Sequence, residues 1–260
     1  MLPLSMWWSL AAVVLSQGVA AVTPSALTTI ASFSNNTFIE NIAVRADGHI
    51  LLSTLGEISP AAVFTVDPRH PSRIPAYYTS FPAPVTGLTG ITEYAKGRFA
   101  VIAGTWNVTT RRGKGFEIWA MDTTVEPPRT QKLANIRDPS ITALNGTIVL
   151  PRCPNTILIA ESNIGGVYSF NIKTRKIRKV IQDPSMSPSG LASNMGINGL
   201  RIFEGHLYYT NSAQGTLNRM AIDDMGYKLG DPMVLWRHPP TDGSTQDDFI
   251  MDLLGLKSRD

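Results

Sequence analysis

The sequence predicts an all-β fold, a β-propeller, and three observations predict it. A unit of about fifty residues recurs along the chain, which is a length typical of propeller blades. Each unit contains short stretches in which apolar and polar residues alternate, as they do in half-buried strands. After residue 21, no stretch shows clear helical periodicity over about ten residues. Strand-only repeats at this spacing are typical of four-stranded blades around a central channel.

The first 21 residues are expected to be a signal peptide. Residues 6–15 form an apolar run, and the small residues after it place Val19 and Ala21 for cleavage after Ala21. The run is shorter than the ~20 apolar residues that span a bilayer, which argues against a membrane anchor, although no Lys or Arg precedes it. We therefore expect residues 1–21 to be removed and residues 22–260 to form one propeller domain. The mature chain would be secreted or lie in the secretory-pathway lumen, away from the membrane.

Three Asn-x-Ser/Thr sequons agree with export, at Asn35, Asn107 and Asn145. Asn35 and Asn107 lie in expected loops, whereas Asn145 opens an expected strand and is the doubtful acceptor. The single cysteine, Cys153, excludes an internal disulfide, so the core alone must hold the fold. The net charge of +3 is small and forms no basic stripe, so nucleic acid is not an expected partner.

The repeated element is an apolar strand, a short Gly- or Ser-rich turn and a second alternating strand that ends in Asp or Asn. The first strands are expected over residues 49–54, 98–103, 156–162 and 206–211. The second strands are expected over residues 63–67, 118–122, 167–171 and 217–223. β-Branched and aromatic residues are frequent in all of them, as in strands generally. Tight turns before three first strands are expected at Asp47-Gly48, Lys96-Gly97 and Glu204-Gly205.

Each repeat also opens with a strand that would line the central channel. These openings are expected over residues 40–44, 89–93, 145–149, 198–202 and 247–251. Their first residues would sit at the channel mouth, and they are Glu40, Thr89, Asn145, Asn198 and Asp247. The carboxylates and amides among them suit a hard cation or a polar ligand. The plainer interpretation is that Asn, Asp and Gly are ordinary turn residues before a strand.

Several motifs with established chemistry do not occur. The sequence has no nucleophile elbow, zinc-binding His motif, phosphate-binding glycine loop or dinucleotide fingerprint, and its four histidines do not cluster. Most strand aromatics are expected in the core between blades. Tyr208 and Tyr209 are candidates to line a ligand chamber instead.

The blade openings resemble those of the gluconolactonase, regucalcin and strictosidine synthase-like six-bladed propellers, over about residues 33–252. A fungal secreted branch of this superfamily, which includes hetero-Diels–Alderases of tropolone–sesquiterpene biosynthesis, is more similar still. The strings that carry this resemblance are Phe38–Arg45, Gly196–Arg201, Leu207–Asn211 and Asp247–Phe249. The resemblance implies a propeller whose channel mouth binds a largely apolar small molecule.

Resemblance to the fungal branch implies an enzyme that directs a cycloaddition between a tropolone quinone methide and a humulene-type sesquiterpene. Asn145 and Asn198 would then be catalytic, with Glu40, Tyr208 and Asp247 also binding the substrate, and no cofactor would be required. Resemblance to the lactonases implies instead a metal-dependent lactonase or esterase. Glu40, Asn198 and Asp247 would then hold Ca²⁺ or a similar divalent metal. A non-catalytic binding propeller is the third interpretation.

The length departs from the six-bladed type. Six blades need roughly 300 residues, whereas this chain has 260. Alternation fades over residues 253–260, so we expect about four and a half blades and an incomplete C-terminal end. A truncated product and a smaller or dimer-completed propeller both remain open. Unpaired blade edges would favour self-association.

Overall fold

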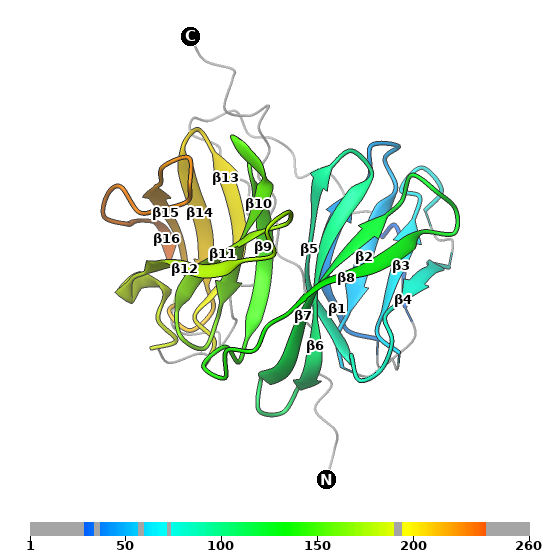
Figure 1. The fold of residues 1–260 in the computed structure, drawn as a ribbon, viewed down its shortest axis with the longest axis horizontal. Coiled ribbons are helices and arrows are strands. Elements are labelled where there is room, and N and C mark those ends of the chain that lie inside the picture. Colours follow the sequence, from blue (N-terminus) through cyan, green and yellow to red (C-terminus); the bar gives the residue numbers. More distant parts are fainter. Residues whose placement is uncertain (1–28, 34–36, 57–59, 72–73, 190–193, 238–260) are drawn as a thin grey trace.

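The computed structural model describes residues 29–33, 37–56, 60–71, 74–189 and 194–237. These residues form four antiparallel sheets of four strands each, together with the 3-10 helix Pro184–Met186. Each sheet takes four consecutive strands in chain order, which is the topology of a propeller blade. Figure 1 shows β1–β8 on one side of the molecule and β9–β16 on the other. The predicted all-β propeller class is confirmed, as a four-blade arrangement.

The four blades follow one another along the chain. Blade 1 contains β1 (Ile39–Val44), β2 (Ile50–Thr54), β3 (Ala62–Val66) and β4 (Ala76–Ser80). Blade 2 contains β5 (Gly87–Ala95), β6 (Arg98–Asn107), β7 (Arg112–Asp122) and β8 (Arg129–Asn135). Blade 3 contains β9 (Leu144–Leu150), β10 (Cys153–Glu161), β11 (Gly166–Asn171) and β12 (Ile177–Gln182). Blade 4 contains β13 (Ile197–Phe203), β14 (His206–Asn211), β15 (Thr216–Ala221) and β16 (Met233–Arg237).

The first three strands of every blade match the predicted strands. The sequence pattern predicts no residue ranges for the outer strands β4, β8, β12 and β16. The outer strand β8 shows the reason. Only Leu133 is buried in it, and Arg129, Gln131 and Lys132 are exposed. A strand at the rim has little to pack against, so it lacks the alternation that identifies a half-buried strand.

Some predictions fall outside the described residues. The signal peptide over residues 1–21, the fifth opening over residues 247–251 and the expected incomplete end all lie there. The six-bladed type, export and truncation therefore stay predictions. Within the described part of the chain, no helix has the length and apolarity needed to cross a membrane.

The core consists of three apolar clusters, each packed between two neighbouring blades. Strand β10 in blade 3 shows how one strand serves two of them. Ile157 and Ile159 pack toward blade 2, and the alternate residues Leu158 and Ala160 pack toward blade 4. Successive side chains point to opposite faces of a sheet, so burial of both faces makes the whole strand apolar. This accounts for the continuous apolar runs in the middle of the chain.

The innermost strands hold the blades in a series. Strand β1 contacts β5, β5 contacts β9, and β9 contacts β13. Among the described residues, no comparable contact joins β13 back to β1. Within the described part of the chain, the two middle blades therefore have a neighbouring blade on each face, and blades 1 and 4 have one neighbouring blade each.

Candidate binding site at the inner strands

A β-bulge interrupts the first strand of every blade at the same place. The register between the first and second strands shifts at Glu40, Thr89, Asn145-Gly146 and Asn198-Gly199. A bulge leaves its extra residue outside the ladder and changes the direction of its side chain, and bulges are frequent beside functional sites. The stacked alignment of Glu40, Thr89, Asn145 and Asn198 predicted from the sequence is therefore correct.

Hydroxyl groups from the preceding blade hold the two asparagine bulges. Thr89 Oγ1 donates a hydrogen bond to Leu144 O at 2.7 Å. Ser162 Oγ donates one to Ile197 O, also at 2.7 Å. Each acceptor carbonyl belongs to the residue just before a bulge asparagine. Both hydroxyl-bearing residues are fully buried, so these bonds fix the position of one blade's bulge relative to the next blade.

Close backbone contact brings the bulges of neighbouring blades together. A Cβ atom added at Gly90 would lie 2.7 Å from Asn145 O, and one added at Gly146 would lie 2.5 Å from Asn198 O. Neither distance leaves room for a side chain, so glycine is required if the inner strands are to approach this closely. Asn145 and Asn198 consequently lie on adjacent strands at the same level of the inner surface.

The two asparagine side chains differ in how they are bonded. Asn198 is 7% exposed, and its Nδ2 donates to Ser212 Oγ at 3.2 Å. Asn145 is 2% exposed, and within the described part of the chain its carboxamide makes no hydrogen bond. A buried carboxamide has two N–H donors and a carbonyl acceptor to satisfy. Asn198 therefore keeps part of its hydrogen-bonding capacity for a ligand, and Asn145 keeps all of it.

The other predicted binding residues are more dispersed. Glu40 is half-buried at the β1 bulge. Tyr208 is half-buried in β14, where it pairs with Arg201, three residues beyond Asn198, and its ring lies 6.5 Å from that of His206. Asp247 lies outside the described residues. The structure therefore brings Asn145 and Asn198 together and leaves the roles of the other residues as predictions.

The predicted divalent-metal site needs Glu40, Asn198 and Asp247. No group of three or more His, Cys, Asp or Glu side chains that could hold a metal ion occurs among the described residues. The third predicted ligand, Asp247, lies outside the described residues. The metal site stays a prediction, and no chemical step is derived through it.

The three sequons differ in their surroundings. Asn107 is exposed at the end of β6, where its Oδ1 accepts a hydrogen bond from Thr110 N at 2.9 Å. The buried bulge position of Asn145 leaves no room for a glycan. Asn35 lies outside the described residues. Asn107 is thus the accessible acceptor of the two that the structure describes.

Sequence reasoning missed two residues next to the site. Glu161 and Ser162 end the apolar stretch of blade 3, and both are fully buried. Glu161 accepts hydrogen bonds from the backbone just before Asn145, at Thr142 N and Ala143 N. A carboxylate at the buried end of an apolar strand was the available signal, because such a charge needs several partners inside the protein.

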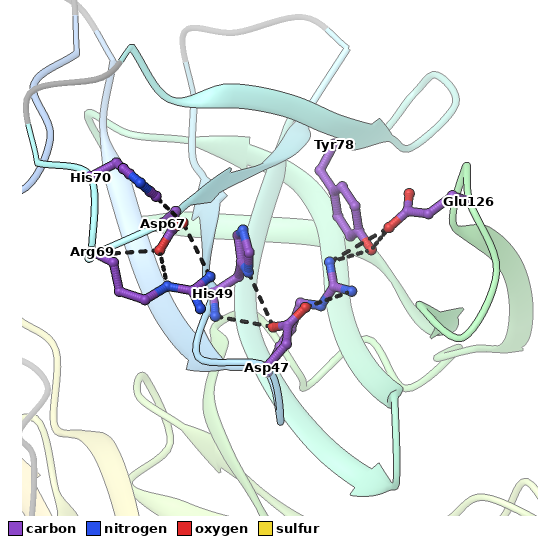
Figure 2. A network of polar contacts seen from close by, with 8 residues as sticks. Asp47, His49, Asp67, Arg69, His70, Tyr78 and Glu126 are labelled. Carbon is purple, nitrogen blue, oxygen red and sulfur yellow. Dashed lines mark hydrogen bonds and ion pairs between the residues drawn. The ribbon is translucent and has the colours of Figure 1, made fainter.

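A separate polar network lies at the other end of the inner strands (Figure 2). Arg45, in the turn after β1, donates from Nη1 to Tyr78 Oη at 2.9 Å and pairs with Asp47 at 3.2 Å. Tyr78 Oη donates to Glu126 Oε1 at 3.1 Å. Burial raises the pKa of Tyr78 to about 12, so its hydroxyl stays protonated. Glu126 belongs to the β7–β8 connection, so this network ties blade 1 to blade 2 away from the bulges.

Comparisons with known proteins agree with this architecture. No protein-family model and no curated protein sequence matches the chain, but solved structures do. A luciferin-regenerating enzyme has a TM-score of 0.55 at 12% identity, over 76% of this chain and 63% of that one. A putative TolB from Agrobacterium tumefaciens has a TM-score of 0.50 at 11% identity, over 80% and 68%. An auxiliary nutrient binding protein from Bacteroides thetaiotaomicron has a TM-score of 0.50 at 12% identity, over 75% and 41%.

These likenesses define the class of protein. The neighbours are β-propellers, and the chain is a β-propeller protein with four blades in its described part. It spans 41% of the nutrient binding protein's length and 63% of the luciferin-regenerating enzyme's length. At identities of 11–12%, the likeness extends to the fold alone. The neighbours include an enzyme and a binding protein, and they add no support to the resemblance with the fungal cycloaddition branch.

Proposed function

We propose that the chain binds a small molecule at its inner-strand bulges, with the Asn145 carboxamide as the principal hydrogen-bonding group. The observation that carries this proposal is that the Asn145 carboxamide lies at its bulge with no hydrogen bond among the described residues, while its N and O atoms are not among the unpartnered side-chain atoms that are fully shielded from solvent. A ligand carbonyl or hydroxyl can bond to this carboxamide, because the carboxamide can both donate and accept. The net contribution of one such hydrogen bond is about 0.5–1.5 kcal/mol.

The reaction that we propose for the bound molecule is a hetero-Diels–Alder-type ring closure. The four bulge positions carry a carboxylate, a hydroxyl and two amides, and the Thr89 hydroxyl is already bonded to Leu144 O. These positions pair no nucleophile with a base. A cycloaddition requires neither, because it is accelerated by holding two reactants in contact and by hydrogen bonds to the heterodiene carbonyl. Asn145 would supply that hydrogen bond, and Asn198, held by Ser212, would supply a second contact.

Binding is tested by calorimetric titration with tropolone, a small probe that carries a carbonyl and a hydroxyl group. Asn145→Ala is compared with wild type and with Asn135→Ala, which changes an exposed asparagine on the outer strand β8. We expect Asn145→Ala to weaken tropolone binding at least about tenfold, equivalent to ~1.4 kcal/mol. Asn135→Ala should bind as wild type does. Equal affinities for both variants would refute the role of Asn145.

Catalysis is tested with a tropolone quinone-methide precursor and humulene alcohol. Product yield and stereochemistry equal to those without protein would rule out the cycloaddition. The lactonase alternative is kept because Glu40 and Asn198 occupy equivalent bulges. Thermal melts in EDTA and in calcium chloride, with glucono-δ-lactone as substrate, decide between the two. Calcium-dependent hydrolysis with a higher melting temperature would favour the lactonase.

A further inference from the structure

We propose that Glu161 and Ser162, consecutive residues at the end of β10, are positioning residues for both bulge asparagines. Glu161 would set Asn145 in its own blade, and Ser162 would set Asn198 in the next blade. The inference rests on the proposed function in that it takes these asparagines as the ligand contacts. The contacts that carry it belong to the protein alone.

Glu161 holds the backbone that leads into Asn145. Its Oε1 accepts hydrogen bonds from Thr142 N at 2.9 Å and from Ala143 N at 2.7 Å. Its Oε2 accepts one from Ile164 N at 2.5 Å. Hydrogen bonds to an ionised acceptor are shorter and stronger than those between neutral groups. Three of them on a fully buried carboxylate fix the segment before the bulge to the end of β10.

Ser162 bonds to the segments before both asparagines. Its backbone N–H donates to Ala143 O at 2.9 Å, within blade 3. Its hydroxyl donates to Ile197 O at 2.7 Å, and its carbonyl accepts from Gly196 N at 2.7 Å. Two consecutive residues therefore bond to the backbone immediately before each of the two bulges. A displacement of this dipeptide would move both asparagine side chains.

The equivalent residue in blade 4 shows why a carboxylate is needed in blade 3. Asn211 pairs with Ile197 as Glu161 pairs with Leu144. The Asn211 amide donates from Nδ2 to Ser185 O and Ser187 O, in the β12–β13 connection. Glu161 has only N–H groups to bond, so both of its side-chain oxygens must accept. A carboxylate provides two acceptors, whereas an amide provides one.

The test follows the side-chain NH₂ signals of Asn145 in NMR spectra of ¹⁵N-labelled protein. These signals are assigned by their loss from the spectrum of Asn145→Ala. Glu161→Gln keeps one acceptor and turns an NH₂ group toward Ile164 N. The matched control is Glu117→Gln, which changes another buried carboxylate, bonded to Trp119 and Lys132 in blade 2. We expect Glu161→Gln to shift or broaden the Asn145 signals and to weaken tropolone binding about fivefold to tenfold. Glu117→Gln should leave the Asn145 signals and the tropolone affinity unchanged, although we expect it to lower the melting temperature.

Unchanged Asn145 signals and affinity in a folded Glu161→Gln protein would show that Glu161 is only structural and would overturn the proposal. If that variant does not fold, Ser162→Ala provides the test, because it removes only the hydroxyl bond to Ile197 O. The Asn198 NH₂ signals should then shift, and unshifted signals would overturn the proposal. If tropolone fails to bind the wild type, the proposed function is at fault, and the NH₂ signals still decide on positioning because they need no ligand.

Discussion

Replacing Gly146 by alanine tests the close approach of blades 3 and 4 that the bulges require. The added Cβ would lie 2.5 Å from Asn198 O and 3.2 Å from the Cα atom of Gly199. Both are backbone atoms, so no side chain can rotate away to make room. The inner strands must therefore separate by roughly 0.5–1 Å to restore normal contact. The shift moves the carbonyl of Asn198, and with it the bulge.

The magnitude follows from two opposing effects. Overpacking of a tight site costs about 1–3 kcal/mol. Alanine restricts the unfolded chain more than glycine does, which returns about 0.4–1 kcal/mol. The net loss is about 0–2.6 kcal/mol with a midpoint of about 1.3 kcal/mol, and at the midpoint the melting temperature falls by roughly 3–5 °C for a domain of this size. If tropolone binds at Asn198 as proposed, its affinity should fall in parallel, because the substitution moves this bulge.

The assay is thermal unfolding followed by circular dichroism, with Gly230→Ala as the matched control. A Cβ at Gly230 meets nothing within 4 Å, so only the effect on the unfolded chain remains. Its melting temperature should stay the same or rise by about 1–4 °C. The two substitutions are thus expected to change the melting temperature in opposite directions. A Gly146→Ala protein as stable as the Gly230→Ala protein would refute the argument from close packing.

Three further predictions address other contacts. Thr89→Val should lower the free energy of unfolding in urea by about 1–3 kcal/mol, because the buried Leu144 carbonyl loses its 2.7 Å hydrogen bond; a loss below about 0.5 kcal/mol would contradict it. Phe81→Ala should lower the free energy of unfolding in guanidinium titrations by about 3–5 kcal/mol, because the ring is fully buried and packs edge-on against Trp119 with ring centroids 5.5 Å apart. A smaller loss would contradict this and mean that neighbouring side chains fill the cavity. Burial alone would raise the pKa of Asp183, but hydrogen bonds from Lys228 and Ser185 lower the pKa overall. The stability from this carboxylate is therefore present above the ordinary Asp pKa of about 3.9 and is lost as pH falls below it and through the lowered pKa. Asp183→Asn should show a shallower loss in urea titrations over that pH range, and an equal slope would argue against this ion pair.

The sequence predicts the repeat well because blade strands carry local patterns. Runs such as Ile157–Ala160 are apolar at every position once both faces are buried, and the turn glycines Gly48, Gly97 and Gly205 all have positive φ angles. Aligning the openings places the bulge residues correctly, because equivalent positions repeat from blade to blade. The rim strands lack such a pattern, so their bounds could not be predicted.

The bonds that shape the site are harder to predict, because they join distant parts of the chain. Thr89 and Leu144 are 55 positions apart, and Ser162 and Ile197 are 35 apart. No periodicity links residues in different blades, and the partners are backbone carbonyls, which every residue has. Asn145 and Asn198 could be selected from the alignment, whereas the buried acceptor role of Glu161 depends on N–H groups that only the folded chain brings together.

The serial contacts of the inner strands have a thermodynamic consequence for the described blades. Units stacked in a line, each in contact only with its neighbours, behave as a short one-dimensional array whose end units open at a lower free energy than its middle units. Blade 4 is an end unit of this kind, and blade 3 is a middle unit. A ligand that bridges Asn145 and Asn198 would fasten the end unit to the middle one. Its binding free energy would then appear as slower amide hydrogen exchange throughout blade 4, far from the atoms that the ligand touches.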